Sequence, residues 1–380
     1  MNSLIQTAFD NSFGQTTQSA PPASIFAPPA VEKTEAPKVD EFGLEDFKAR
    51  ILVAGVGGAG NNSITRLYTM GIEGASTVAL NTDAKHLGVS KAHKKILIGR
   101  EKTRGLGCGG FPSIGKDAAL ESDREIKTVL EGVDMLYLVA GMGGGTGTGA
   151  APVIAKIAKE SGAIVIGCVT VPFKIEGARM GKAEDGLSAL RQSADTVIVI
   201  ENDRLLKVAG DLPMQQAFAV ADNLIATIIK GVTETISQPS LINLDYADVK
   251  AVMHSGGVAA VGFGESDTKN RAEEAVAKAM ANPLIDVDYN GGTGALIHIT
   301  GGPDMKLDEA TLIGGYVSEK LDPEAQVIWG ARIDPNFKGK IQVITIVTGV
   351  NSPFILGPTQ TKMPQARDVP QELGIPVWKV

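Results

Sequence analysis

The sequence predicts an α/β fold in which helices cover both faces of a mostly parallel sheet. Apolar segments of strand length alternate with helical stretches between residues 50 and 200, which is the pattern of repeated β-α-β units. A long segment with helical periodicity follows at 214–236, and a shorter series of strands and helices comes after it. We therefore expect a larger parallel-sheet domain, a long central helix and a smaller α/β domain.

The first half of the chain should open with a β-α-β unit. Residues 51–54 form an apolar run, the glycine-rich residues 55–60 indicate a turn, and residues 62–70 have helical periodicity. Further strand signals follow at 76–80, 95–98, 135–140, 163–171 and 196–200. Since helical stretches separate these strands, the sheet should be mostly parallel and covered on both faces.

The central helix expected at 214–236 has one apolar side and ends before Pro239. The residues on that side are Phe218, Ala221, Leu224, Ile225, Ile228 and Ile229. The smaller domain should then contain a helix at 270–281 and strands at 256–264, 295–300, 326–331 and 341–348. The predicted domain boundaries are 48–236 and 237–356.

Both ends of the chain lack the periodicity of folded segments. Residues 1–47 are rich in Ser, Thr, Gln, Pro and Ala, a composition typical of disordered segments. Residues 357–380 have little periodicity apart from an apolar cluster at 373–378. We expect a disordered N-terminal arm and a flexible C-terminal tail.

Composition narrows the classes of function. The 380 residues carry a formal net charge of −7, which argues against a nucleic-acid partner. The two cysteines, Cys108 and Cys168, are too few for a disulfide framework or a cysteine zinc site. The apolar stretches are too short to span a bilayer, and the N-terminus lacks the pattern of a signal peptide. We expect a cytoplasmic protein without direct membrane insertion.

Residues 141–149, with the sequence GMGGGTGTG, form the most informative segment of the chain. They lie between the strand expected at 135–140 and a helix expected at 151–160, with Pro152 in its first turn. A helix N-terminus attracts anions through its unpaired N–H groups and its dipole, and glycines allow an oxyanion to approach closely. Thr146 and Thr148 can add hydroxyl donors. This segment predicts a phosphate-binding loop, with a ligand-free tight turn as the alternative.

Two other glycine motifs offer competing interpretations. Residues 55–60 match GxGxxG after a strand, and Asp83 follows the second strand, as in Rossmann-like dinucleotide-binding enzymes. A nicotinamide-dependent oxidoreductase is thus a competing hypothesis, although the four histidines form no evident hydride-transfer site. Residues 110–117 resemble a P-loop, but Asp117 stands where Ser or Thr is required and no clear strand precedes them. A Walker-type site is therefore rejected.

Five motifs in a fixed order carry a resemblance to a known family. They are residues 55–62, GMGGGTGTG at 141–149, Pro172-Phe173 with Glu176 and Arg179, Glu201-Asn202-Asp203, and NLDYAD at 243–248. In this combination, residues 48–356 closely resemble the FtsZ family of tubulin-like cell-division GTPases, with details that resemble archaeal members. The resemblance implies a Rossmann-like GTP-binding domain joined by a central helix to a smaller C-terminal domain, the tubulin/FtsZ fold.

The resemblance also implies which residues contact the nucleotide, GTP or GDP. Glu176 and Arg179 would reach its ribose and phosphates. Asn202 and Asp222 would recognise the guanine edge, and Phe218 would stack on the base unless it is an ordinary core aromatic. The whole implied set is Gly58, Ala59, Gly60, Asn61, Asn62, Gly143, Gly144, Gly145, Thr146, Gly147, Thr148, Gly149, Glu176, Arg179, Asn202, Phe218 and Asp222.

The acidic motif at 243–248 has two interpretations. Asp245 and Asp248 lead into a helix, so they could simply cap it. The resemblance implies instead that Asn243, Asp245 and Asp248 lie opposite the nucleotide and complete the GTPase site of the next subunit. The carboxylates would polarise the attacking water, while the glycine loop and Mg²⁺, bound mainly through the nucleotide phosphates, stabilise charge. Hydrolysis would then require head-to-tail assembly of the homopolymer.

Partners and location follow from the same resemblance. Residues 370–380 would bind a membrane-tethering division protein of the SepF or FtsA type, and the filaments would form the mid-cell division ring. Phe111 and Ser113 depart from the family pattern, so no contact of the loop at 105–115 with Mg²⁺ or the terminal phosphate is assigned. No metal-ligating residues are expected. A nucleotide-binding regulator that neither assembles nor hydrolyses GTP is a third hypothesis.

Overall fold

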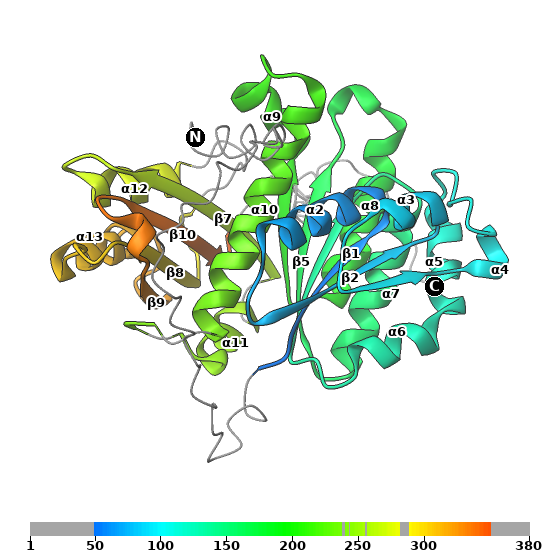
Figure 1. The fold of residues 1–380 in the computed structure, drawn as a ribbon, viewed down its shortest axis with the longest axis horizontal. Helices are drawn as coiled ribbons and strands as arrows, with labels where there is room; N and C mark the ends of the chain where they lie inside the picture. The colour runs from blue at the N-terminus through cyan, green and yellow to red at the C-terminus, as the bar shows by residue number, and fades with distance from the viewer. Residues whose placement is uncertain (1–48, 238–239, 243, 255–256, 282–288, 351–380) are drawn as a thin grey trace, which may run out of the picture.

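The computed structural model describes residues 49–237, 240–242, 244–254, 257–281 and 289–350. Within them, ten strands form one sheet in the order β3-β2-β1-β4-β5-β6-β7-β10-β8-β9 (Figure 1). The strands are β1 (Ile51–Val56), β2 (Ala75–Asn81), β3 (Lys94–Leu97), β4 (Met135–Gly141), β5 (Ile164–Val171), β6 (Thr196–Glu201), β7 (Gly257–Ser266), β8 (Gly294–Gly301), β9 (Gln326–Ile333) and β10 (Ile341–Thr348). Strands were expected near all ten of these positions.

The helices in the described residues fall between the strands, as the alternating pattern predicts. They are α2 (Gly57–Met70), α3 (Ala84–Val89), α4 (Arg100–Thr103), α5 (Pro112–Glu121), α6 (Asp123–Leu130), α7 (Thr146–Glu160), α8 (Ala178–Ser193), α9 (Asn202–Ala209), α10 (Met214–Ser237), α11 (Tyr246–His254), α12 (Arg271–Met280) and α13 (Leu307–Ser318), with 3-10 turns η2 (Lys174–Glu176) and η3 (Pro335–Phe337). Helix α10 confirms the expected central helix.

The sheet is mostly parallel, as predicted. From β3 to β7 in the sheet order, each strand is parallel to the next. Strand β10 is antiparallel to β7 and β8, and β8 is parallel to β9. Every residue of β1, β6 and β8 is buried. A strand that is buried along its whole length needs cover on both faces of the sheet, and the helices provide it.

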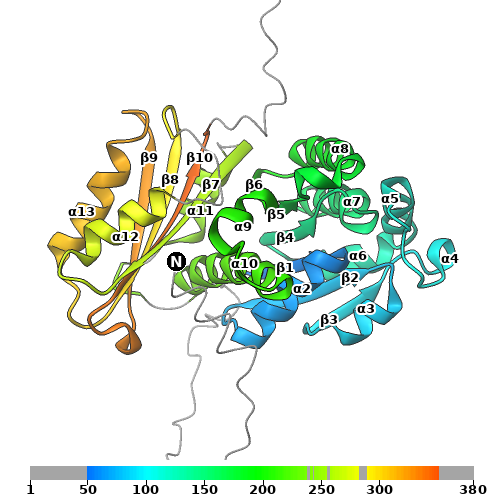
Figure 2. The same ribbon diagram turned by 90° about the horizontal axis from the view of Figure 1, so that it is seen from above.

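One face of the sheet carries α2, α10 and α11, whose apolar residues share a single core with the strands. The other face carries α5 to α8 over the first half of the sheet, and α12 and α13 over the second half. Helix α10 lies between the two halves (Figure 2). Its predicted apolar side is buried except for Phe218, which is 39% exposed. Phe218 was therefore wrongly placed among the core residues of this helix.

The two halves share one hydrogen-bonded sheet. Strand β6 pairs with β7 from Thr196 opposite Gly257 to Ile198 opposite Ala259. The smaller domain predicted from the sequence thus continues the sheet of the larger one. The boundaries at 48–236 and 237–356 remain predictions.

The helix after β1 begins earlier than predicted. Strand β1 extends to Val56 and α2 begins at Gly57, so the turn expected at 55–60 and the helix start at residue 62 were wrong. Gly57 has a φ of +74°, which reverses the chain within one residue. A Cβ atom on Gly60 would lie 2.2 Å from the carbonyl oxygen of Val139. Glycine therefore lets the first turn of α2 pack directly on β4.

The same correction applies to the helix after β4. Helix α7 begins at Thr146, inside the glycine-rich segment, and Pro152 lies in its interior rather than in its first turn. A Cβ atom on Gly149 would lie 1.9 Å from the carbonyl oxygen of Pro112 in α5. Part of the glycine run therefore serves close packing between α5 and α7.

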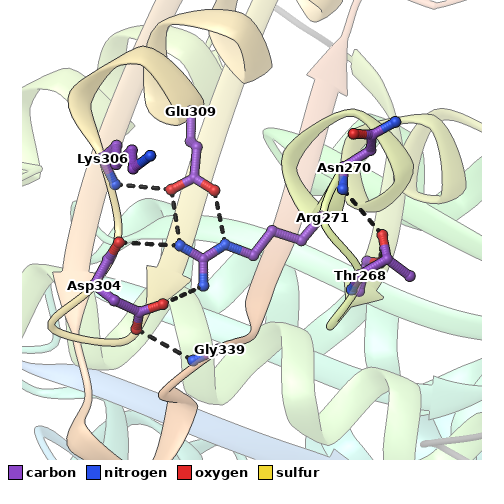
Figure 3. A network of polar contacts seen from close by, with 8 residues as sticks. Thr268, Asn270, Arg271, Asp304, Lys306, Glu309 and Gly339 are labelled. Carbon is purple, nitrogen blue, oxygen red and sulfur yellow. Dashed lines mark hydrogen bonds and ion pairs between the residues drawn. The ribbon is translucent and has the colours of Figure 1, made fainter.

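An ion-pair network holds the two outer helices of the second half together (Figure 3). Arg271 at the start of α12 is 8% exposed. Its guanidinium donates to the Glu309 carboxylate at 2.7 and 2.9 Å and to the Asp304 carboxylate at 2.6 Å. The hydrogen bonds from Arg271 lower the pKa of both carboxyl groups. Since Arg271 has partners on two segments, it fixes α12 against α13.

Two predicted segments, 1–47 and 357–380, lie outside the described residues. Among the helices of the described part, none has both the length and the apolar character that crossing a membrane requires.

Candidate nucleotide-binding site

The carboxyl ends of β1, β4, β5 and β6 border two adjoining cavities of about 1080 and 880 Å³. Ligands of open parallel sheets bind at this edge. Both cavities are lined by residues from α2, β5, α9 and α10, namely Gly58, Ala59, Thr170, Asn202 and Phe218. The two therefore form one continuous site.

Most of the residues predicted to bind nucleotide line these cavities. The first cavity is lined by Gly58, Ala59, Gly60, Asn62, Asn202, Phe218 and Asp222. The second adds Gly144, Gly145, Thr146, Gly147, Glu176 and Arg179. The structure thus gathers residues that are more than 160 positions apart in the sequence. Their individual roles stay predictions.

Four predicted residues do not line either cavity: Asn61, Gly143, Thr148 and Gly149. Asn61 and Thr148 are buried, and neither the Asn61 amide nor the Thr148 hydroxyl has a hydrogen-bond partner among the described residues. Gly143 has a φ of +87°, and a Cβ atom there would lie 2.8 Å from the carbonyl oxygen of Arg179. In this structure, Gly143 allows a positive φ angle and Gly149 allows α7 to pack closely on α5.

Two helix N-termini face the site. Helix α2 begins at Gly57 directly after β1, and α7 begins at Thr146 five residues after β4. Their unpaired N–H groups and dipoles favour an anion in the second cavity. Gly144 and Gly145 border this cavity without side chains that would block an approaching oxyanion.

The Thr146 hydroxyl is already engaged within the protein. It lies 2.7 Å from the Thr82 hydroxyl and 3.5 Å from the sulfur of the buried Cys108. Thr82 follows β2, so this contact joins the glycine segment to the next strand end. Sequence reasoning missed Thr82 and Cys108, because neither belongs to a recognisable motif.

Glu176 and Arg179 form an ion pair beside the glycine segment. Glu176 also accepts a hydrogen bond from the backbone N–H of Phe173 at 3.0 Å, and Arg179 Nε donates to the Gly143 carbonyl at 3.4 Å. The Phe173 ring contacts the ring of Phe218 edge to face, with centroids 5.9 Å apart. Arg179 therefore places a positive charge beside the glycine segment and the second cavity.

The first cavity has a carboxylate at its inner wall. Asp222 of α10 accepts a hydrogen bond from the Ser63 hydroxyl of α2. Burial raises the pKa of Asp222 to about 6, against the lowering effects of Ser63 and of the positive charge of Arg66. His86 of α3 lines the same cavity. Ser63 and Arg66 were not singled out from the sequence, since they stand outside its glycine motifs, and His86 was considered only as one of the four histidines that form no evident hydride-transfer site.

The loop at 105–115 reaches the glycine segment from the other side. A Cβ atom on Gly145 would lie 3.1 Å from the backbone nitrogen of Phe111 and 2.5 Å from Cβ of Cys108. The Phe111 side chain is exposed, and Lys182 of α8 lies over its ring and donates to the Gly110 carbonyl at 2.8 Å. The loop approaches the predicted phosphate site through the backbone at Phe111 and the side chain of Cys108, whereas the Phe111 side chain is exposed.

The predicted acidic residues lie at the other end of the molecule. Asp245 accepts a hydrogen bond from the backbone N–H of Asp248 at 2.7 Å, at the start of α11. The neighbouring Tyr246 donates to the carbonyl of Asp134, the residue before β4, at 2.8 Å. The glycine segment begins at the opposite end of this strand, about 20 Å away for seven residues. Figure 1 shows α9 toward the top of the molecule and α11 toward the bottom.

One chain therefore does not bring the acidic residues to the nucleotide cavities. The structure contains the hydrogen bond that the helix-capping interpretation of Asp245 requires, from the backbone N–H of Asp248. Asn243 lies outside the described residues.

Comparisons with known proteins agree with the motifs. Residues 50–210 match the GTPase domain of the Tubulin/FtsZ family, and residues 257–351 match the FtsZ family C-terminal domain. The chain is 57% identical over 321 residues to cell division protein FtsZ 2 of Methanocaldococcus jannaschii, spanning 84% of this chain and 83% of that protein. It is 52% identical over 335 residues to FtsZ 1 of Pyrococcus furiosus, spanning 88% of this chain and 90% of the relative.

The fold agrees as well. A solved FtsZ dimer of M. jannaschii aligns with a TM-score of 0.77 at 52% identity, over 80% of this chain and 90% of that one. CetZ1 of Haloferax volcanii, at 24% identity, shares the fold with a TM-score of 0.71. This chain is therefore a member of the FtsZ family, and the FtsZ relatives that it matches here are archaeal.

Proposed function

We propose that this chain is a cell-division GTPase that assembles head to tail, so that each active site combines the nucleotide edge of one subunit with the acidic edge of the next. The observation that supports this proposal is the separation of the two residue sets within one chain. The glycine segment follows β4, whereas α11 is bonded to the residue that precedes β4. Stacking two copies end to end would bring both sets together.

The nucleotide edge would hold guanine in the first cavity and the phosphates in the second. Asp222 and Asn202 border the first cavity, where an ionised carboxylate would accept hydrogen bonds from the ring N–H and the amino group of guanine. Adenine does not present this pair of donors. Backbone N–H groups at the starts of α2 and α7, together with Arg179, would bind the phosphates.

The N–H donors of α2, α7 and Arg179 would bind phosphate oxygens of a nucleotide that arrives with Mg²⁺. Among the described residues, no group of three or more His, Cys, Asp or Glu side chains could hold a metal ion. Such a site fits an ion bound mainly through phosphate oxygens and water, as Mg²⁺ commonly is in nucleotide sites. When bound, Mg²⁺ would neutralise charge on the phosphates.

The acidic edge would supply the hydrolytic groups. Asp245 and Asp248 would orient and polarise the water that attacks the γ-phosphate of the neighbouring subunit, with Asn243 beside them. The glycine segment of that neighbour would stabilise the developing charge. Capping and catalysis are compatible, because one carboxylate oxygen of Asp245 serves the cap and the other can face the partner.

The setting of this reaction is the division ring. We propose that filaments of this chain form the ring at mid-cell in the cytoplasm. Residues 370–380, which lie outside the described part of the chain, would bind a membrane-tethering partner of the SepF or FtsA type. An apolar cluster at the end of a tail can fold onto a groove of a partner.

Light scattering and phosphate release, measured together after addition of GTP, ATP or NADH at several protein concentrations, test the proposal. We expect scattering with GTP alone and a turnover per subunit that rises steeply with protein concentration. Turnover that is independent of concentration would contradict assembly-dependent hydrolysis. GTP binding without scattering or turnover would favour a regulator, and NADH binding would favour the oxidoreductase hypothesis.

A further inference from the structure

The inner wall of the first cavity contains a hydrogen bond that the proposed function does not yet use. Ser63 of α2 is 4% exposed, and its hydroxyl donates to one carboxylate oxygen of Asp222 in α10. Both residues line the cavity. The other acceptor near this hydroxyl, the carbonyl of Ala59, is 3.4 Å away. A hydroxyl has one proton to donate, and here it is directed to the carboxylate.

A positive charge is held beside the same carboxylate. Arg66 lies on α2 three residues after Ser63, and its Nε donates to the side-chain oxygen of Asn223. Asn223 is fully buried, so the guanidinium is fixed by a partner that cannot move freely. The charge of Arg66 acts on Asp222 and favours its ionised form.

The protonation state of Asp222 decides what the cavity can recognise. An ionised carboxylate accepts hydrogen bonds at both oxygens, whereas a protonated one presents a donor at one of them. Guanine needs two acceptors at this wall. Burial acts against the ionised form and raises the pKa of Asp222 to about 6. Ser63 and Arg66 lower this pKa, so they determine how much of the carboxylate is ionised near neutral pH.

We propose that Ser63 is a positioning residue for guanine selection, whose hydroxyl turns the Asp222 carboxylate toward the cavity and favours its acceptor-only form, with Arg66 in support. This inference rests on the proposed function, because it assumes that guanine occupies the first cavity. It concerns the chemistry of selection and is independent of whether hydrolysis needs assembly.

Other ionisable groups surround this wall and enter the design of the test. His86 of α3 lines the same cavity, so its imidazole is a second ionisable group beside Asp222. On the side of α9, Arg204 pairs with Glu201 at 3.4 Å. The measurements are therefore repeated in a His86→Gln background, which removes the imidazole and leaves Ser63 and Asp222 in place.

The dissociation constant of GTP is measured from about pH 5 to about pH 8 for the full chain, Ser63→Ala and Ser63→Thr. In Ser63→Ala, we expect affinity close to that of the unmodified chain at the alkaline end and a loss of about 3- to 10-fold near pH 7, because the protonation midpoint moves to higher pH. Ser63→Thr keeps the hydroxyl and should stay within about twofold. Preference for GTP over inosine triphosphate, which lacks the amino group, should shrink in Ser63→Ala.

A merely structural role would give a different result. If Ser63→Ala weakens GTP binding by one factor at every pH, or leaves it unchanged at every pH, the inference is overturned. If the unmodified chain itself fails to bind GTP, the proposed function fails instead. Circular dichroism of both variants checks that the fold is retained.

Discussion

The two ends of the molecule use aspartates in opposite ways. At the nucleotide edge, Asp222 lies partly buried in the cavity wall, accepts a hydrogen bond from Ser63 and has its pKa raised by burial to about 6. At the other edge, Asp245 is exposed, and its carboxylate accepts a hydrogen bond from the backbone N–H of Asp248 at the start of its own helix. The Asp222 carboxylate has its partners within one chain, whereas the Asp245 carboxylate is, in our proposal, the one that acts on a neighbouring subunit.

This difference separates two functions in one chain. A single chain forms both cavities of the nucleotide edge, so a monomer should bind GTP. The acidic edge faces away from that cavity, so a monomer should hydrolyse GTP poorly. Substitutions at the first edge should therefore change affinity, and substitutions at the second should change turnover.

The largest effect is expected at Asp248. Asp248→Ala should lower the maximal GTPase rate about 100-fold or more, because a positioned carboxylate that activates water contributes at least this much. GTP affinity should stay unchanged. The backbone N–H that Asp245 caps remains in this variant, so the cap is preserved. The rate is measured by phosphate release at saturating GTP.

Asp308→Ala is the matched control, since Asp308 is an exposed acidic residue in the first turn of α13. It should keep the full rate. Unchanged hydrolysis in Asp248→Ala would remove Asp248 from the mechanism.

The second effect concerns Asp222. Asp222→Asn should weaken GTP binding about 10- to 100-fold, because it replaces a charged acceptor with an amide that also presents donors. GTP affinity of the unmodified chain should also decline as pH falls through about 6, where Asp222 becomes protonated. Fluorescence titration with GTP checks both expectations.

Protonation of Asp222 should affect GTP affinity and folding stability in opposite ways, because it weakens GTP binding and stabilises the fold. The pKa of Asp222 in the fold lies above its ordinary value of 3.8, so the stability that its neutral form contributes is present at low pH and is lost as pH rises through about 6. The Asn side chain of Asp222→Asn is neutral at every pH, so this variant does not lose that stability as pH rises. Near neutral pH its melting temperature without nucleotide should equal or exceed that of the unmodified chain, and a clear decrease would contradict the burial argument.

The smallest effect is expected at Tyr246, which connects the acidic edge to the base of β4. Tyr246→Phe removes the hydrogen bond to the Asp134 carbonyl, worth about 1 kcal/mol. We expect the melting temperature to fall by about 2 to 4 °C. Turnover should fall a few-fold, the factor that corresponds to about 1 kcal/mol. GTP affinity should stay unchanged. Tyr316→Phe in α13, whose ring contacts Lys320, is the control. A loss of GTP affinity in Tyr246→Phe would show that the two edges are not separable.

Much of the fold could be predicted because its signals are local. Apolar runs marked the strands, and the central helix α10 was expected at 214–236 and observed at Met214–Ser237. The starts of α2 and α7 were predicted too late, since glycines that looked like turn residues allow close helix packing instead. For Gly60 and Gly149, the reason lies in carbonyl groups of Val139 and Pro112, which are far away in the sequence.

The site could be predicted in outline and not in detail. Glycine runs and the acidic motif are contiguous in the sequence, so they were visible. The partners of Asp222 and Thr146 were not, because Ser63 precedes Asp222 by 159 positions and Thr82 precedes Thr146 by 64. Such pairs exist only once the sheet has brought the helices together.

Mixing two inactive variants tests the central claim most directly. Asp222→Asn keeps an intact acidic edge and Asp248→Ala keeps an intact nucleotide edge, so a filament of both contains some complete sites. At a GTP concentration that Asp222→Asn does not bind, an equal mixture should regain up to about a quarter of the unmodified rate, because random order makes one interface in four complete. A mixture no more active than the average of the two variants would contradict an active site shared between subunits.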